Sequence, residues 1–217
     1  MRRLKAARRR FTPPHRAIYI TGGSGSTAGT ERAQGASRAF KEAPDGVLQQ
    51  VALSYWKRPR ARAQALGLIR RWPKTTILLA SNDPMAFGAA DAAIKLGRTP
   101  GADILVAGIN WSRDALQRIQ KGEMVATIGG HFLGGGFSLV MLRDYHDGRD
   151  FAAEGLELPF RMQTLDRSNT AVYLRHLGDN DWSKIDFARF AKSRNPAISR
   201  YDFSLRALLS QFEVAAQ

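Results

Sequence analysis

Two asparagines follow two apolar segments of this 217-residue sequence, where their amide groups could bind a ligand that carries hydroxyl groups. Asn82 follows an apolar segment at 76–80, and Asn110 follows another at 104–107. If both segments are strands of an open α/β sheet, the amides lie at the edge where such sheets bind ligands. An amide donates and accepts hydrogen bonds, as sugar hydroxyls require. Helix capping by Asn82 and a turn at Asn110 are the structural alternatives.

Two more side chains could contact the same ligand. Trp56 lies just beyond the apolar segment at 48–54, and its indole face could stack on a sugar ring. Arg32 lies at the start of a predicted helix and could donate two hydrogen bonds to neighbouring hydroxyls or to a carboxylate. A packing role for Trp56 and an ordinary exposed position for Arg32 are the alternatives.

The glycine-rich segment at 22–29 matches a dinucleotide-binding loop only loosely. Gly23, Gly25 and Ala28 have the GxGxxA spacing that brings backbone amides close to a pyrophosphate. The acidic residue that would bind a ribose is absent after the next strand, because residues 54–56 are Ser-Tyr-Trp. The Gly-Lys-Ser/Thr motif of nucleoside triphosphate sites is absent as well. A nucleotide-dependent oxidoreductase is therefore the least favoured function, and a flexible turn is the plainer interpretation of the segment.

Apolar and amphipathic segments alternate regularly along the first two thirds of the sequence. We expect strands at 17–21, 48–54, 76–80, 104–107 and 125–128, and helices at 31–43, 59–72, 84–96 and 113–121. After residue 150 the pattern weakens to a strand near 158–162 and helices near 183–192 and 204–212. This alternation predicts an α/β fold, in which a three-layer α-β-α, doubly wound and mostly parallel sheet is followed by a mainly helical C-terminal extension.

The net charge of +14 suggests binding to nucleic acid or to a membrane surface, but the distribution of the charge argues against both. Residues 1–16 hold seven of the 33 Lys and Arg residues and no acidic residue, so the rest of the chain carries +7. The long uncharged segment at 124–142 contains five glycines and His131, which argues against a membrane span. We therefore expect no specific nucleic-acid partner and no membrane insertion.

The residue types also argue against catalysis. The absence of cysteine excludes disulfides, thiolate metal sites and cysteine nucleophiles. The four histidines are dispersed, and no pattern of nucleophile, base and orienting residue emerges. We expect a protein that is not an enzyme and that has neither a cofactor nor a metal. The charged N-terminus is not followed by an apolar segment, so we expect no signal peptide, and the chain as written would remain in the cytoplasm.

Five segments together resemble a known family. They are ERAQGASRAF, SYWKRPRA, ASNDPMAFGAADAAIKLGR, ILVAGIN and IQKGEMVATIGG, and they are similar in content and order to the second lobe of the periplasmic sugar-binding proteins related to ribose-binding protein. The resemblance covers residues 16–160 and implies the type 1 periplasmic binding fold.

The resemblance implies ligand-binding roles for specific residues. Arg32, Trp56 and Asn82 fall on ligand contacts of the family. The position of Asn110 is usually an aspartate, so this chain keeps the hydrogen bonding and lacks the charge. A hinge glutamine of some members falls near Gly130, where only the adjacent His131 could replace it, and an ordinary loop histidine is the alternative.

The function implied is that of a non-catalytic solute-binding protein that recognises a sugar or related polyol for ABC-type transport or sensing. Its partners would be an ABC transporter permease or a membrane sensor kinase, and full-length members are periplasmic. The regulatory cores of lac-repressor-type proteins share the fold, so the effector-binding core of a transcription regulator is the alternative. That function needs a helix-turn-helix, for which residues 1–16 are too short.

Members of the family have two lobes, and we expect this chain to be truncated and to lack most of the first lobe. Four parts are expected: a basic remnant of a preceding helix at 1–15, a ligand-binding lobe at 16–122, a hinge crossover with a segment of the missing lobe at 123–150, and a returning strand with a helical extension at 151–217. Without the first lobe, five apolar side chains are expected to form an exposed patch: Phe132, Leu133, Phe137, Leu139 and Leu142.

Overall fold

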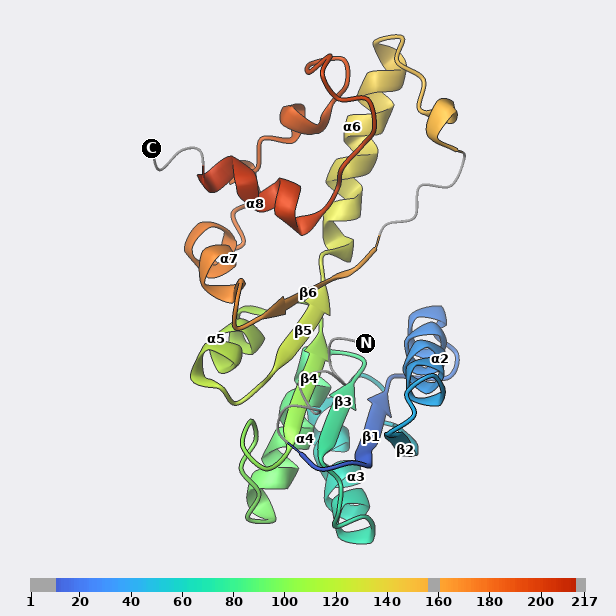
Figure 1. Ribbon diagram of the computed structural model, residues 1–217, viewed down its shortest axis with the longest axis vertical. Helices are drawn as coiled ribbons and strands as arrows, with labels where there is room; N and C mark the ends of the chain where they lie inside the picture. Colours follow the sequence, from blue (N-terminus) through green and yellow to red (C-terminus); the bar gives the residue numbers. More distant parts are fainter. Residues whose placement is uncertain (1–10, 156–160, 214–217) are drawn as a thin grey trace. The chain divides into compact units, whose positions relative to one another are not determined.

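A computed structural model describes residues 11–155 and 161–213 and divides into two compact units. The first unit holds the residues up to 128 together with 165–170, and the second holds 129–164 and the residues from 171 onward. Figure 1 shows that the first unit is built around a β-sheet, whereas the second is mainly helical.

The sheet has six strands in the order β2-β1-β3-β4-β5-β6, and each of the pairs from β2 to β5 is parallel. The strands are β1 (His15–Thr21), β2 (Gly46–Leu53), β3 (Ile77–Ala80), β4 (Leu105–Ile109), β5 (Ala126–Gly129) and β6 (Gln163–Asp166). The chain moves outward from β1 to β2 and then returns to the other side of β1 with β3. The carboxyl ends of β1 and β3 therefore form the switch point where open α/β sheets bind ligands.

Four helices alternate with these strands: α2 (Thr27–Lys41), α3 (Arg58–Arg71), α4 (Asp83–Lys95) and α5 (Arg113–Lys121). Ala17 and Tyr19 of β1 face α2 in a core cluster that includes Phe40. Ile18 and Ile20 point to the opposite face and are also fully buried. The sheet is therefore covered on both faces, and the predicted three-layer α/β fold class is confirmed.

Helix α2 begins four residues earlier than expected. Ser26 caps it, because its hydroxyl accepts a hydrogen bond from the Gly29 amide at 3.3 Å. The last three residues of the glycine-rich segment at 22–29 therefore belong to the first turn of a helix, and the five before them form the turn that leads into it.

The second unit contains the C-terminal extension, which is mainly helical as predicted. Its elements are η1 (His131–Leu133), α6 (Gly134–His146), η2 (Ala152–Glu154), α7 (Thr170–Leu177), η3 (Trp182–Lys184), η4 (Phe187–Phe190) and α8 (Leu205–Glu213). The strand expected near 158–162 falls partly on 156–160, outside the described residues, and β6 lies a few residues later. The single helix expected near 183–192 is wrong. Two short 3-10 turns form there because Asp181 and Asp186 each accept an amide of the following turn.

An aromatic cluster forms the core of the second unit. Phe137 of α6 stacks on Phe203 with ring centroids 4.3 Å apart, and contacts Phe190 at 5.3 Å. Phe137 is only 2% exposed and Leu133 only 6%, so the prediction of a continuous exposed patch is wrong for these two residues. The sequence pattern did not show that the extension would cover this face of α6.

The rest of the predicted patch is exposed. Leu139 and Leu142 are 68% and 59% exposed, and Phe132 is 39% exposed while packing on Trp182 with ring centroids 4.8 Å apart. The apolar residues that reach the surface of α6 are therefore fewer than expected.

Asp144 connects α6 to the extension. The carboxylate is fully buried and accepts hydrogen bonds from the backbone amides of Lys192 and Ser193, at 2.7 and 2.8 Å, and from the Tyr201 hydroxyl at 2.9 Å. Burial alone would raise the pKa of this carboxyl, but the hydrogen bonds from Ser193, Lys192 and Tyr201 hold the pKa below its ordinary value. Asp144 is therefore held in its charged form where the last turn of α6 meets the extension.

Candidate functional site

Arg32 and Trp56 come together at the carboxyl ends of β1 and β2. The guanidinium of Arg32 donates from Nη1 to the carbonyl oxygen of Ser81 at 2.7 Å, and its central carbon lies 5.9 Å from the centre of the Trp56 ring. The Arg32 side chain is half-buried; burial lowers its pKa, while the nearby Tyr19 and Asp83 act in the opposite direction. One of the five N–H donors of the Arg32 guanidinium is therefore hydrogen-bonded to the protein itself.

Asn82 caps α4, as the structural alternative proposed. Its Oδ1 accepts a hydrogen bond from the Met85 amide at 2.9 Å. Its Nδ2 points at the Trp56 carbonyl oxygen from 3.5 Å, which is at the limit of a hydrogen bond. The amide therefore joins the end of β3 to the Trp56 segment, and the residue is only 8% exposed.

The indole of Trp56 lies directly on Gly22. A Cβ atom at Gly22 would be 2.0 Å from the ring, and one at Gly29 would be 3.5 Å from it. The backbone of Tyr55 and Trp56 has φ values of 52° and 64°, a left-handed conformation that turns the chain over the end of the sheet. The glycine at position 22 therefore makes room for a tryptophan, a packing role that the spacing of the glycines did not reveal.

Asn110 occupies the turn after β4. Its φ is 128°. Its backbone N–H donates to the Ile128 carbonyl oxygen at 2.7 Å, and its side chain is half-buried. Asn110 lies at the same edge of the sheet as Asn82, because β3 and β4 are parallel neighbours.

Asp83 holds the loop that carries Asn110, a role that the sequence reasoning missed. Asp83 is fully buried; its Oδ1 accepts from the Thr127 hydroxyl at 2.8 Å, and its Oδ2 accepts from the Ser112 amide at 2.9 Å. A Cβ atom at Gly108 would lie 2.2 Å from Oδ1, so only glycine leaves space for this carboxylate. The sequence signal was present as the Asn-Asp pair at 82–83, of which the sequence analysis used only Asn82.

A chain of hydrogen-bonded, buried hydroxyl groups supports this edge of the sheet, and the sequence analysis did not predict it. The Tyr19 hydroxyl lies 2.8 Å from the Ser81 hydroxyl, which donates to Thr21 at 3.0 Å, and Thr21 donates to the Gly29 carbonyl oxygen at 3.1 Å. This network connects β1, β3 and the start of α2. The network also holds Ser81, whose carbonyl oxygen accepts the hydrogen bond from Arg32.

Of the five predicted site residues, the structure places Arg32 and Asn82 each beside Trp56 and places Asn110 at the same edge of the sheet. His131 belongs to the second unit, where it is exposed and makes an edge contact with the Phe132 ring at 6.0 Å.

Two negative findings concern only residues 11–155 and 161–213. This part of the chain has no group of three or more His, Cys, Asp or Glu side chains that could hold a metal ion. It has no helix that is long and apolar enough to span a membrane.

Comparison with known proteins identifies relatives. Residues 5–146 match a family described as the periplasmic binding protein domain. The chain is 32% identical over 109 residues to the D-allose-binding periplasmic protein of Escherichia coli K12, and the match covers 50% of this chain and 34% of that protein.

The solved structures show the same relationship. A periplasmic sugar-binding protein from Pseudomonas fluorescens superposes with a TM-score of 0.78 and 37% identity, over 90% of this chain and 60% of that one. An ABC transporter periplasmic solute-binding protein from Actinobacillus succinogenes shares the fold, with a TM-score of 0.61 and 22% identity over 78% and 56% of the two chains. The 217 residues thus span 34% to 60% of the lengths of these relatives.

Proposed function

This chain belongs to the periplasmic binding protein domain family, a family of non-catalytic solute-binding proteins, and we propose that it binds a sugar or related polyol for transport or sensing. D-allose is the first ligand to test, since the E. coli relative is a D-allose-binding protein. The partner would be an ABC transporter permease or a membrane sensor kinase. The compartment would be the periplasm, to which the family belongs.

The contact of Arg32 with Trp56 carries the proposal. The guanidinium is half-buried at the switch point of the sheet, with one N–H group on the Ser81 carbonyl oxygen and the ring of Trp56 beside it. A planar donor beside an aromatic ring suits a sugar, because the ring stacks on the carbon skeleton while the donors bind neighbouring hydroxyls. The Asn82 Nδ2 adds a donor at the same place.

Asn110 and His131 complete the proposed site. Asn110 would hydrogen-bond to a ligand hydroxyl from the turn after β4, and His131 would contribute from the segment after β5. We propose residues 16–122 as the ligand-binding lobe, 123–150 as the hinge crossover and 151–217 as the returning strand and extension. The helical remnant predicted at 1–15 does not extend to its last residues, because 11–14 are not helical and His15 begins β1, while residues 1–10 lie outside the described residues.

Weak affinity is expected for these 217 residues alone. The chain spans 60% of the P. fluorescens relative, so contacts made by the remaining part of such a protein are not available here. Each missing hydrogen bond removes about 1 kcal/mol. An affinity loss of tenfold follows from about 1.4 kcal/mol, so dissociation constants in the millimolar range are expected.

Tryptophan fluorescence of the full chain, titrated with D-allose, D-ribose and myo-inositol, tests the proposal. At least one of these should give a saturable change that disappears in Trp56→Phe and persists in Trp72→Phe, because Trp72 ends α3 on another part of the first unit. A change that survives Trp56→Phe, or the absence of a saturable change with every sugar, would contradict the proposed site.

A further inference from the structure

The edge strand β2 has the features of a strand that accepts a partner. It is eight residues long, with the sequence GVLQQVAL, and contains neither a charged residue nor a proline. Among the described residues it pairs only with β1, so its outer edge has free backbone donors and acceptors. Edge strands are usually protected by charges, prolines or covering loops, because an unprotected edge pairs with other chains.

A β-bulge exposes apolar side chains on this strand. The register shifts at Gln49, so that Leu48 lies opposite Ala17 and Val51 lies opposite Tyr19. Ala17 and Tyr19 face α2, hence Leu48, Val51 and Leu53 face α2 as well. Leu48 packs on the core cluster, but Val51 and Leu53 are each 40% exposed.

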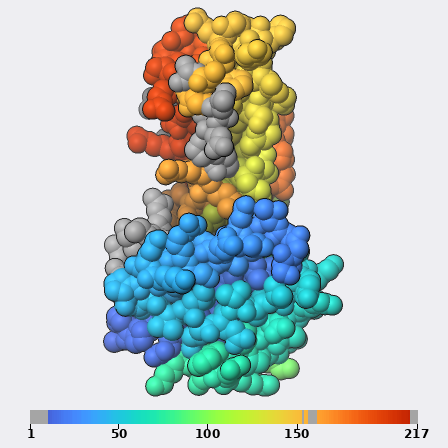
Figure 2. Space-filling model, turned by 90° about the vertical axis from the view of Figure 1, so that its right-hand side faces the viewer, coloured from blue at the N-terminus to red at the C-terminus, as the bar shows by residue number. Residues whose placement is uncertain are grey.

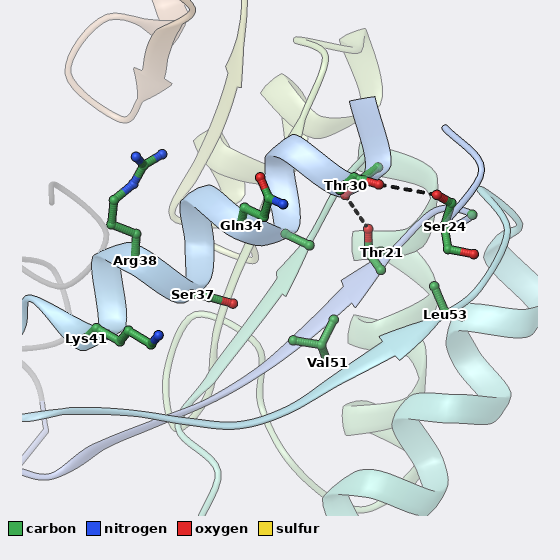
Figure 3. A pocket seen from close by; sticks show the side chains of 12 residues that line it. Thr21, Ser24, Thr30, Gln34, Ser37, Arg38, Lys41, Val51 and Leu53 are labelled. Atoms are coloured by element: carbon green, nitrogen blue, oxygen red, sulfur yellow. Dashed lines mark hydrogen bonds between the residues drawn. The ribbon is translucent and has the colours of Figure 1, made fainter. Parts of the chain in front are cut away.

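A groove of about 590 Å³ lies between α2 and these exposed side chains. Figure 3 shows Val51 and Leu53 on β2, with Gln34, Ser37 and Lys41 along the helix opposite. The blue and cyan residues of α2 and β2 lie on the face of the first unit seen in Figure 2. The groove has an apolar floor and a polar rim, and it runs beside a free strand edge.

The charged residues of the groove are all positive. Arg38 and Lys41 line it, and none of the described residues that line it is acidic. Both cations are exposed, and neither forms an ion pair within the described part of the chain. An occupant of complementary charge therefore carries carboxylates.

We propose that β2 and this groove bind an extended acidic segment of a partner protein by strand addition. The segment pairs with the free edge of β2, and its alternate apolar side chains cover Val51 and Leu53. Its carboxylates bind Lys41 and Arg38. A second copy of this chain is a poorer occupant, because its β2 has no acidic residue and would bring a second set of cations to the same place.

Hydrogen–deuterium exchange and fluorescence anisotropy of the full chain test this with a labelled, capped peptide in which valine and glutamate alternate over nine residues. The expected result is saturable binding with slower exchange at residues 46–53. A peptide of the same composition with its valines in one block, and one with lysine in place of glutamate, are expected to bind at least about tenfold more weakly.

Two variants locate the site. Arg38→Glu/Lys41→Glu is expected to weaken binding about tenfold, whereas Arg113→Glu/Lys121→Glu, which reverses two exposed cations of α5, leaves it within about twofold. Val51→Thr/Leu53→Thr removes apolar surface while placing β-branched threonine, which strands tolerate, at both positions, and it is also expected to weaken binding.

Three results would overturn the proposal. The first is unchanged exchange at 46–53 when the alternating peptide is added. The second is that the peptide with its valines in one block, or the peptide with lysine in place of glutamate, binds as tightly as the alternating peptide. The third is protection of 46–53 that increases with protein concentration in the absence of peptide, which would show a second copy on this edge.

Discussion

Asn110 is the position at which this chain departs from the aspartate that the family resemblance leads one to expect. Its backbone lies at φ 128°, a positive value that few residues other than glycine adopt, and asparagine and aspartate are among those that adopt positive φ most often. A charged acceptor strengthens a hydrogen bond to a sugar hydroxyl, because bonds to charged groups contribute about 1.5–3 kcal/mol against about 1 for neutral ones. We expect Asn110→Asp to tighten sugar binding about tenfold.

The matched control is Asn180→Asp, which makes the same chemical change at φ 60° on an exposed residue of the second unit. Calorimetric titration with D-allose should show no change for this variant. Equal or weaker binding by Asn110→Asp would mean that this side chain does not face the ligand.

Gly22 is the residue on which the position of Trp56 depends. A methyl group there would lie 2.0 Å from the indole ring, so Gly22→Ala must displace the ring or the strand end. Overpacking of this kind costs about 1–3 kcal/mol of unfolding free energy. We expect Gly22→Ala to lower the urea midpoint and to shift the tryptophan emission. Gly25→Ala is the control, because a Cβ atom there meets no heavy atom within 4 Å; similar losses in both variants would refute this account.

At the scale of elements, the apolar strands were predictable and the polar caps were less so. The runs ending at residues 80 and 107 are uninterrupted and buried on both faces, which is the pattern of central parallel strands. The predicted start of α2 lies four residues too late, because the helix begins where the Ser26 hydroxyl accepts a hydrogen bond from the Gly29 amide. The helix expected near 183–192 is broken by Asp181 and Asp186, whose carboxylates bond to local amides.

The C-terminal extension depends on the charge of Asp144. Its pKa in the folded state lies below the unfolded value, so its contribution to stability is complete above the unfolded pKa and is lost as the pH falls through the folded pKa. We expect the second unit to lose stability in acid, and Asp144→Asn to remove much of that pH dependence while lowering stability at pH 7. Urea unfolding followed by the emission of Trp182 between pH 7 and pH 3 measures this.

Asp114→Asn, which changes an exposed carboxylate of α5, is the control for the acid dependence. An Asp144→Asn protein that keeps the full acid dependence would show that other carboxyls cause it.

At the scale of the whole molecule, the sequence predicted the fold class and four residues of one sheet edge because strand ends follow directly from apolar runs. It did not predict what supports them. Asp83 and Ser81 are polar residues inside a core, and the side chains and amides to which they bond lie 29 to 62 positions away. Such pairings depend on strand order, which a single sequence does not specify. For the same reason, the sequence did not predict that Phe190 and Phe203 pack on Phe137 of α6.

The central claim is that a sugar binds beside Arg32 and Trp56 at the carboxyl edge of the sheet. The indole N–H signals of the tryptophans in a ¹H–¹⁵N NMR titration with D-allose test it most directly, because Trp72, which ends α3 on another part of the first unit, serves as an internal control. We predict that the Trp56 signal moves saturably, while that of Trp72 stays in place. A titration in which the Trp56 signal does not move, or in which all four move together in proportion to the sugar added, would contradict the account.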